Sequence, residues 1–431
     1  MTILIKNGHV LDPETGRDSI CDVLTENEKI VAVDDNIQAE ADRVIDADGS
    51  YVMPGFIDLH VHFRDPGFEY KETLATGGRA AVRGGVTTVC AMPNTKPVID
   101  TGVKVAEVQE RAKTESLTNV FQQGAVTMGQ QGEDLADIRG MAASGCIGIS
   151  EDGKSVMNAS LYRKGMRLAA ECGLIVCAHC EDITMVEGGV MNADAKAEQM
   201  GMRGITNSVE DVIVARDILL SKDTGAQLHL CHCSTEDSVK MIRAAKKEGL
   251  RVTGEVCPHH FTLTTEEITS DDGNFKMNPP LRGKADREAL IRGLQDGTMD
   301  VISTDHAPHA SAEKKRGMKT APFGIVGLET SAALTYTELV DKGILTPMQM
   351  AEKMSYNPAK ILGLADKGSV SEGKTADLVI FDPDKVYEID RETFVSKGKN
   401  TPFHGRKVKG EVTLTMVGGR IVYEGGEIID Q

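Results

Sequence analysis

The chain has 431 residues, 40% of them hydrophobic, and a formal net charge of −17. This length exceeds one small core and suits a large barrel with a smaller second domain. The negative charge argues against nucleic acid or an anionic lipid surface as a partner, and no apolar run approaches the roughly 18 residues that would cross a bilayer.

Short strands separated by turns are predicted at both ends of the chain. The N-terminal part contains ILIKNGHVLD, ICDVLTENEKIVAVDD and RVIDADGSYVMPG, with Asn7-Gly8 as a hairpin signal. The same pattern of short strands and turns occurs near the C-terminus in ADLVIFDPD and EVTLTMVGGRIVYEGGE. We therefore predict a small β-sandwich domain composed of residues 1–51 and 366–431, with a second domain inserted between its two parts.

The first residues show no export signal. MTILIKNGHVLDPETG lacks a basic region followed by an apolar stretch, and it has no small-residue cleavage site. The nine cysteines are an odd number and occur in apolar surroundings such as CGLIVCAHC, which favours reduced, buried thiols over a disulfide framework. Both features predict a cytoplasmic protein.

Between residues 52 and 365, apolar β-branched runs alternate with longer stretches of helical period. The strand candidates in order are GFIDLHVHF, VTTVCAMPN, NVFQQGAVT, CIGISED, LIVCAHCED, AQLHLCHCS, RVTGEVCPHH and MDVISTDHAPH. Each closes on polar or ionisable residues, and a (β/α)8 TIM barrel gathers its active site at the carboxyl ends of its strands. An open doubly wound sheet would concentrate ligands at one switch point instead. The pattern predicts an α/β fold with a barrel as the catalytic domain.

Candidate metal ligands stand at the ends of several predicted strands. His60 and His62 close the first one, and residues two apart on a strand project from the same face, so both can bind one ion. His179, His232 and Asp305 close the fifth, sixth and eighth. Imidazole and carboxylate donors together predict a metal site that suits zinc, although manganese, cobalt or iron can be argued from the same donors.

The motifs around these residues resemble a known family. The five candidate ligands resemble the ligand set of the amidohydrolase superfamily. The segments DLHVHFRDPGFEYKET, AMPNTKPVID, EVCPHHFTLT, KMNPPLR, STDHAPH and PFGIVGLET resemble the successive signatures of class I bacterial dihydroorotases, which are metal-dependent cyclic amidases. The resemblance covers nearly the whole chain. It implies a zinc hydrolase that reversibly cyclises N-carbamoyl-L-aspartate to L-dihydroorotate in de novo pyrimidine biosynthesis.

The resemblance also implies how two Zn²⁺ ions would be held. One would be bound by His60, His62 and Asp305, and the other by His179 and His232, with the second site more weakly filled. Asp305 would also be the catalytic residue, taking the proton of the attacking hydroxide and passing it to the departing amide nitrogen.

A bridging ligand is needed between the two ions. Many relatives use a carbamylated lysine on the fourth strand, but GCIGIS at residues 145–150 contains no lysine. The resemblance implies that Asp152 of SEDGK is the bridge, together with a hydroxide. Lys154 stays open as an alternative bridge.

A carboxylate on the substrate is suggested by Arg64, which lies two residues beyond His62 and has a planar fork suited to bidentate pairing. The resemblance implies a full set of substrate-binding positions: His62, Arg64, Asn94, Asn278, His309, Phe323 and Gly324. Residues 307–322 are polar and are interpreted either as a lid over the site or as an ordinary long loop.

Two rival functions remain open. The first is another cyclic amidase of the same superfamily, such as a dihydropyrimidinase, hydantoinase or allantoinase. The second is an inactive homologue acting as a structural partner of aspartate carbamoyltransferase, which the six filled ligand positions disfavour. The resemblance implies a homodimer and leaves association with aspartate carbamoyltransferase open as an addition.

Overall fold

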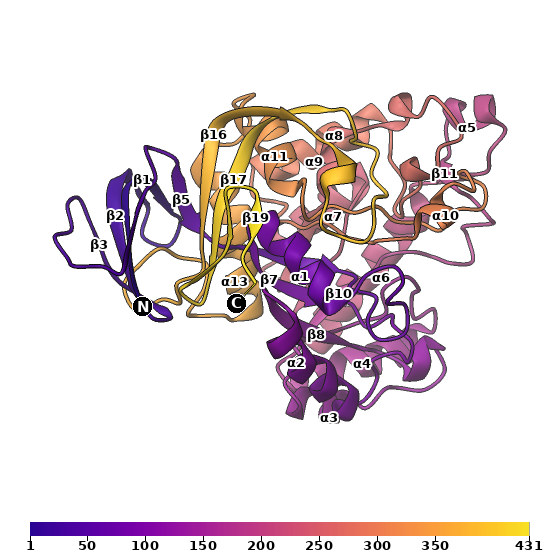
Figure 1. Cartoon of the computed structure of the whole chain (residues 1–431). Helices are drawn as coiled ribbons and strands as arrows, with labels where there is room; N and C mark the ends of the chain where they lie inside the picture. Colours follow the sequence, from indigo (N-terminus) through magenta and orange to yellow (C-terminus); the bar gives the residue numbers. More distant parts are fainter. Residues whose placement is uncertain (431) are drawn as a thin grey trace.

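A computed structural model describes residues 1–430 of the chain. It contains an eight-stranded parallel sheet that forms the barrel and a separate sheet built from both chain ends (Figure 1). The predicted α/β fold, a TIM barrel with a second sheet domain, is confirmed. Among residues 1–430, no helix is both long and apolar enough to cross a lipid bilayer.

The barrel strands coincide with the eight predicted runs. They are β6 (Phe56–Val61), β7 (Val86–Ala91), β8 (Asn119–Ala125), β9 (Gly148–Ser150), β10 (Ile175–Ala178), β13 (Leu228–Leu230), β14 (Val252–Val256) and β15 (Val301–Ile302). All neighbouring pairs are parallel. The barrel is closed just beyond β15, where Val61 bridges His306 and the His62 amide donates to the His306 carbonyl at 2.8 Å. Closure brings the first and last strand ends side by side.

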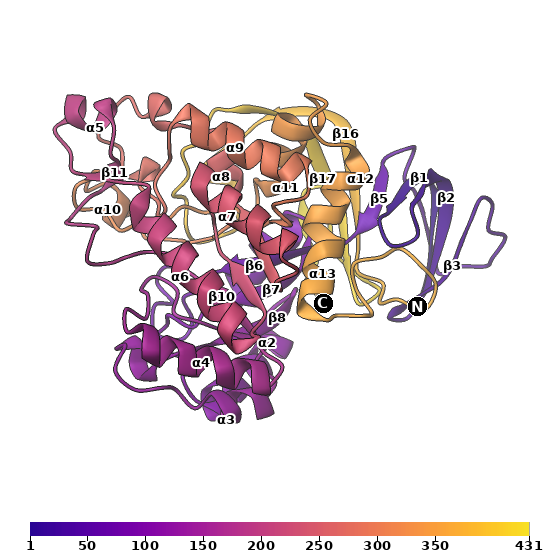
Figure 2. The same cartoon turned by 180° about the vertical axis from the view of Figure 1, so that it is seen from behind.

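Helices follow the strands and cover the outside of the barrel. The main ones are α1 (Leu74–Arg83), α2 (Gly102–Glu115), α3 (Ile138–Ala143), α4 (Ala159–Glu171), α6 (Ser208–Thr224), α7 (Glu236–Lys247) and α9 (Lys284–Gln295). Figure 2 shows α4, α6, α7 and α9 along the outer face, and consecutive helices of this group are in contact. Side chains cap several of them; Thr235, for example, accepts from the Ser238 amide at the start of α7.

The helical layer is completed by shorter elements. After β15 come α10 (Ser311–Lys314), α11 (Ser331–Thr335), a π-helical turn (Tyr336–Val340), α12 (Pro347–Ala351), a second π-helical turn (Glu352–Tyr356) and α13 (Asn357–Leu362). Between the barrel units lie β11 (Met191–Asn192), α5 (Ala195–Met200), β12 (Gly204–Ile205) and α8 (Pro258–Thr262).

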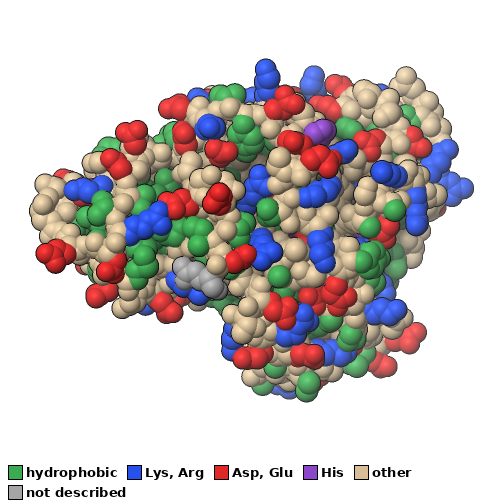
Figure 3. Space-filling view, in the orientation of Figure 1, with side chains coloured by type: hydrophobic (Ala, Val, Ile, Leu, Met, Phe, Trp, Pro, Cys, Tyr) green, Lys and Arg blue, Asp and Glu red, His purple; other side chains and the backbone are tan. Residues whose placement is uncertain are grey.

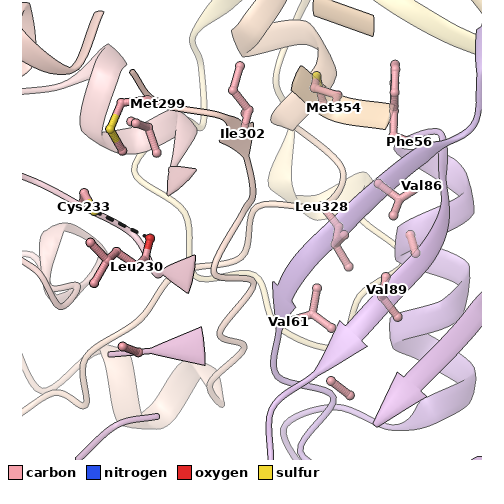
Figure 4. Packing of buried hydrophobic residues seen from close by; sticks show 14 of the residues in the cluster. Phe56, Val61, Val86, Val89, Leu230, Cys233, Met299, Ile302, Leu328 and Met354 are labelled. Atoms are coloured by element: carbon pink, nitrogen blue, oxygen red, sulfur yellow. Dashed lines mark hydrogen bonds between the residues drawn. The ribbon is translucent and has the colours of Figure 1, made fainter. Parts of the chain in front are cut away.

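The core of the barrel lies between its strands and helices. Figure 4 shows Val61, Val86 and Val89 of the first strands facing Leu328, and Leu230, Met299 and Ile302 across the barrel. All residues of β6 and β7 are buried, because helices cover a parallel sheet from outside and packed side chains fill it from inside. A buried, closely packed scaffold therefore supports the strand ends.

The second sheet joins the two ends of the chain. Its strands are β1 (Thr2–Asp12), β2 (Arg17–Glu26), β3 (Lys29–Asp34), β4 (Arg43–Asp46), β5 (Tyr51–Pro54), β16 (Leu378–Glu388), β17 (Lys407–Val417), β18 (Arg420–Glu424) and β19 (Glu427–Ile428). The link between the halves is β5, which pairs parallel with β1 and antiparallel with β16. The predicted division of the chain at residues 51/52 and 365/366 stays a prediction. On the face in Figure 3, acidic and basic side chains are interspersed.

Candidate metal centre and active site

The predicted ligands converge at the carboxyl end of the barrel. His60 lies in β6 and His62 directly after it, whereas the others follow the ends of β9, β10, β13 and β15: Asp152, His179, His232 and Asp305. Their side chains are at most 10% exposed. Because parallel strands end at one edge of the sheet, residues up to 245 positions apart meet in one cluster, as His60 and Asp305 do.

Asp152 lies at the centre of this cluster. Its Oδ1 is 3.2 Å from His60 Nε2, 3.5 Å from His179 Nδ1 and 3.8 Å from His232 Nε2, while its Oδ2 is 3.4 Å from His62 Nε2. One carboxylate therefore faces four imidazoles: Oδ1 lies near those of His60, His179 and His232, and Oδ2 lies near that of His62. This is the arrangement that a bridging ligand needs.

Asp305 faces the first two histidines. Its Oδ1 is 3.0 Å from His62 Nε2 and 3.6 Å from His60 Nε2. Asp305 has φ 48° and His232 has φ 33°, a left-handed backbone conformation that non-glycine residues rarely adopt. Strain of this kind gathers at functional sites, where the surrounding structure holds it in place.

The donor set fits metal ions. The ligand atoms of His60, His62 and Asp305 lie within 4.8 Å of one another, and so do those of His60, Asp152 and His232. His60 Nε2 and Asp152 Oδ1 are buried and have no hydrogen-bond partner. A buried polar atom without a partner costs free energy. A cation between these two atoms would supply the partner that the chain does not provide.

The electrostatics of the cluster keep both carboxylates ionised. Burial alone would raise the pKa of Asp152, but the charges of His60 and His62 outweigh it and hold the pKa well below its usual value. The pKa of Asp305 is likewise lowered: burial opposes this, and the hydrogen bond with His62 prevails. Burial would lower the pKa of His60, yet Asp152 raises it well above its usual value. The cluster therefore favours a bound positive charge.

Glu255, on β14, is a functional residue that sequence reasoning missed. Its fully buried carboxylate accepts from His60 Nδ1 at 2.9 Å, from His229 Nε2 at 3.0 Å and from the His232 amide at 3.0 Å. The bond to Nδ1 leaves His60 Nε2 as the atom that faces Asp152. A glutamate inside the apolar strand run VTGEV was the available signal.

Glu181 links the cluster to the substrate side of the site. One oxygen lies 3.1 Å from His179 Nε2, and the other accepts from the Asn278 amide group at 2.9 Å. His179 therefore presents Nδ1 to Asp152, in contrast to the Nε2 atoms of the other histidines. One carboxylate thus contacts a candidate metal ligand and a predicted substrate-binding residue together.

A cavity of about 230 Å³ opens above the cluster. It is lined by His62, Arg64, Asn94, Asp152, Gly153, His179, His232, Asn278, Asp305, Ala307, His309, Phe323 and Gly324. Every predicted site residue except the fully buried His60 is among them. The structure therefore brings together all predicted metal and substrate positions.

The substrate positions have specific partners in this cavity. Asn94 bonds His62 Nδ1 at 2.9 Å through its oxygen and donates to Asp152 Oδ2 at 3.1 Å. Arg64, at φ 61°, donates through Nε to the Pro308 carbonyl at 3.3 Å, which turns its guanidinium along the cavity wall. His309 lies beside it, with Nε2 3.5 Å from Arg64 Nη2.

Residues 307–322 contribute Ala307 and His309 to the cavity lining. The amine of Lys314 is buried and donates to the carbonyls of Lys276, Pro322 and Gly324 at 2.8–3.0 Å. Burial lowers the pKa of Lys314 to about 7. The interpretations as lid and as ordinary loop both stay predictions.

Lys154, the alternative bridge, is turned to another partner. Its amine donates to the Gln130 carbonyl at 2.8 Å. β9 carries no lysine, and Asp152 follows it by two residues. The geometry favours the aspartate over the lysine as the group between the histidines.

Comparisons with known proteins identify the family of the chain. Residues 51–422 match the amidohydrolase family. The chain is 47% identical to the dihydroorotase of Pelotomaculum thermopropionicum, over 98% of this chain and 99% of that one. It is 46% identical to the dihydroorotase of a Geobacillus species, over 99% and 100% of the two chains.

Solved structures extend the comparison to the fold. An L-hydantoinase (dihydropyrimidinase) from Arthrobacter aurescens has a TM-score of 0.91 at 29% identity, covering 100% of this chain and 97% of the other. A dihydropyrimidinase from Brevibacillus agri has a TM-score of 0.88 at 26% identity, covering 100% and 96%. With the family match, the dihydroorotase identities and the shared fold, the chain belongs to the amidohydrolase family and, within it, to the bacterial dihydroorotases.

Proposed function

We propose that this chain catalyses the reversible conversion of L-dihydroorotate and water into N-carbamoyl-L-aspartate. The observation that carries the proposal is one cavity lined both by an ionised Asp305 with the candidate ligands His62, His179 and His232 and by an acid-binding pair, Arg64 and His309. A cyclic amide with a carboxylate substituent matches both sets of residues.

The proposed cofactor is zinc at two sites. His60, His62 and Asp305 would hold one ion, His179 and His232 the other, with Asp152 between them. When bound, zinc would lower the pKa of a water molecule and polarise an amide carbonyl. Two carboxylates beside two dications leave a local positive charge in an acidic protein, which favours an anionic substrate.

Asp305 is the proposed acid and base. Its Oδ1 accepts the proton of the water whose oxygen attacks the amide carbonyl carbon, and the same proton then goes to the ring nitrogen as the C–N bond breaks. The lowered pKa keeps this carboxylate ionised, so that its oxygen is not already protonated when the water attacks. In the reverse direction Asp305 takes the proton from the ureido nitrogen.

The remaining residues orient the substrate. Arg64, Asn94 and His309 are proposed to bind its carboxylate, and Asn278 with the backbone of Phe323 and Gly324 its ring. Glu181 fixes Asn278, and the Lys314 amine fixes the Gly324 carbonyl, so both ring contacts are held in place before binding. Preorganised donors need no rearrangement as the ring opens.

A hydantoinase or dihydropyrimidinase is the second candidate function, since the solved structures with this fold carry those names. Those names describe rings without an obligatory carboxylate. Arg64 is partly buried and its side chain lines the cavity, which favours the acid substrate.

Substrate choice tests the proposal. The zinc-loaded protein is assayed with L-dihydroorotate, hydantoin, dihydrouracil and allantoin, beside Asp305→Ala and Arg64→Ala. We expect turnover of L-dihydroorotate alone, reduced about 100- to 10,000-fold by Asp305→Ala and about 10- to 100-fold in kcat/KM by Arg64→Ala. Turnover of the neutral rings instead would move the function to the hydantoinases, and a metal-loaded but inactive protein would favour a structural role.

A homodimer and an association with aspartate carbamoyltransferase belong to the proposal on the family resemblance alone. Light scattering of the purified chain, with and without the transferase, measures both. A monomer at all concentrations would contradict the first, and an unchanged mass in the mixture the second.

A further inference from the structure

A lysine that the proposed function does not use lies at the edge of the cavity. Lys71 belongs to the loop between β6 and α1, and its side chain is 13% exposed. Its amine is 3.1 Å from His309 Nδ1 and 3.1 Å from Glu313 Oε1. The loop that carries Arg64 is thereby joined to residues 307–322.

The contacts of His309 define which ring nitrogen carries its proton. Nε2 is 2.7 Å from the Phe323 carbonyl, which only accepts, so Nε2 carries the hydrogen. Nδ1 therefore accepts from the Lys71 ammonium group. Burial, followed by the charges of Arg64 and Lys71, holds the pKa of His309 well below its usual value, so the ring is neutral.

A neutral imidazole is a modest partner for a carboxylate, but a cation on its far nitrogen polarises it. Arg64 Nη2 lies 3.5 Å from His309 Nε2, so an acid group beside both meets the guanidinium directly and shares the imidazole N–H with the Phe323 carbonyl. Lys71 strengthens that N–H as a donor, because hydrogen bonds in a chain polarise one another. It also adds a second positive charge behind the imidazole.

Glu313 ties the same lysine to α10. Its Oε2 accepts from the Ala310 amide at 3.0 Å, and its Oε1 accepts from the Tyr70 hydroxyl at 3.4 Å as well as from Lys71. Tyr70 is 61% exposed, so this contact lies at the rim. Lys71, by contrast, reaches inward from the rim to the cavity wall.

We propose that Lys71 is a positioning residue for the acid group of the substrate: it holds and polarises His309 as an Nε2–H donor beside Arg64. The inference rests on the proposed function and extends it to a residue outside the cavity lining.

Steady-state kinetics with L-dihydroorotate test the role of Lys71. We expect Lys71→Met to raise KM about 10- to 100-fold, the loss typical of one charge-assisted hydrogen bond, while kcat changes by less than about threefold because no reacting atom is touched. Lys71→Arg keeps the charge and the donors and should restore most of the affinity. Competition by orotate, a planar ring with the same acid group, should weaken in parallel with KM.

Two further variants serve as controls. Lys397→Met removes a lysine whose amine donates at 2.7 Å to the Glu69 carbonyl of the same loop without reaching His309, and should leave KM unchanged. Glu313→Gln loosens the rim contact but keeps the Lys71–His309 bond, so its KM should rise less than that of Lys71→Met. Lys71→Gln answers the same question if Lys71→Met does not fold.

The outcomes separate the two proposals. Wild-type turnover of L-dihydroorotate with equal KM in Lys71→Met and Lys397→Met overturns the role of Lys71 and leaves the proposed function standing. A fall in kcat at constant KM, or no rescue by arginine, also overturns it. No turnover of L-dihydroorotate by the zinc-loaded wild type overturns the proposed function and this inference with it.

Discussion

The buried carboxylate of Glu255 offers a direct test of how the metal centre is built. It accepts three hydrogen bonds of 2.9–3.0 Å, two of them from imidazoles. Burial alone would raise its pKa, but the bonds from His229 and His60 hold the pKa well below its usual value, so it is a carboxylate at neutral pH. Glu255→Gln preserves the shape and replaces one acceptor by an NH₂ donor.

The magnitude follows from these contacts. A glutamine can accept from only one of the two imidazoles, so either His60 or His229 loses its partner or changes tautomer. If Nδ1 of His60 loses its acceptor, Nε2 no longer presents a fixed lone pair to the metal. Loss of such an outer partner lowers metal affinity by about 10- to 100-fold. One charge-assisted hydrogen bond of about 1.5–3 kcal/mol corresponds to the same range.

Zinc affinity is measured by competition with a chromophoric chelator. The matched control is Glu329→Gln, whose side chain is 4% exposed and pairs with Arg83 and two backbone amides rather than with a candidate ligand. We expect weaker zinc binding in Glu255→Gln alone. A folded Glu255→Gln protein with wild-type zinc affinity would refute the argument that this carboxylate orients His60.

Three other predictions concern removal of the metal, the role of Glu181 and the titration of Lys314. Removing metal with a chelator should lower the free energy of unfolding by about 3 kcal/mol relative to metal at 100 times its Kd, and an unchanged melting temperature would count against a metal site. Glu181→Gln should lower kcat/KM about tenfold or more by releasing His179 and Asn278 together, and wild-type kinetics would contradict that link. For Lys314, whose pKa burial lowers to about 7, the unfolded chain binds the extra proton between pH 7 and 10. Wild type should therefore gain stability over Lys314→Met as pH rises, by up to about 1.4 kcal/mol per pH unit, whereas a difference independent of pH would show that the buried amine does not titrate there.

The sequence alone determined the architecture and predicted most of the candidate site residues. Strand periodicity and the polar closures of eight runs predicted the barrel, because inward-facing β-branched residues and functional strand ends are local features of the chain. The HxH spacing identified His60 and His62 for the same reason: the geometry of one strand fixes both. The remaining positions were predicted from motifs that resemble a family. The comparisons confirmed that the chain belongs to this family.

Only the tertiary structure decided how those residues are held. Glu255 and Lys71 are far in sequence from the histidines they orient, and a lone acidic or basic residue in a strand or loop carries no local signal of such a partner. Glu181 is far in sequence from Asn278, although it lies two residues from His179, so the choice of Nδ1 in His179 is made locally. The choice of Nε2 in His60, by contrast, depends on which nitrogen meets Glu255 across the barrel. Such pairings arise when the closed barrel brings separate strand ends within hydrogen-bond distance, so they depend on the assembled fold.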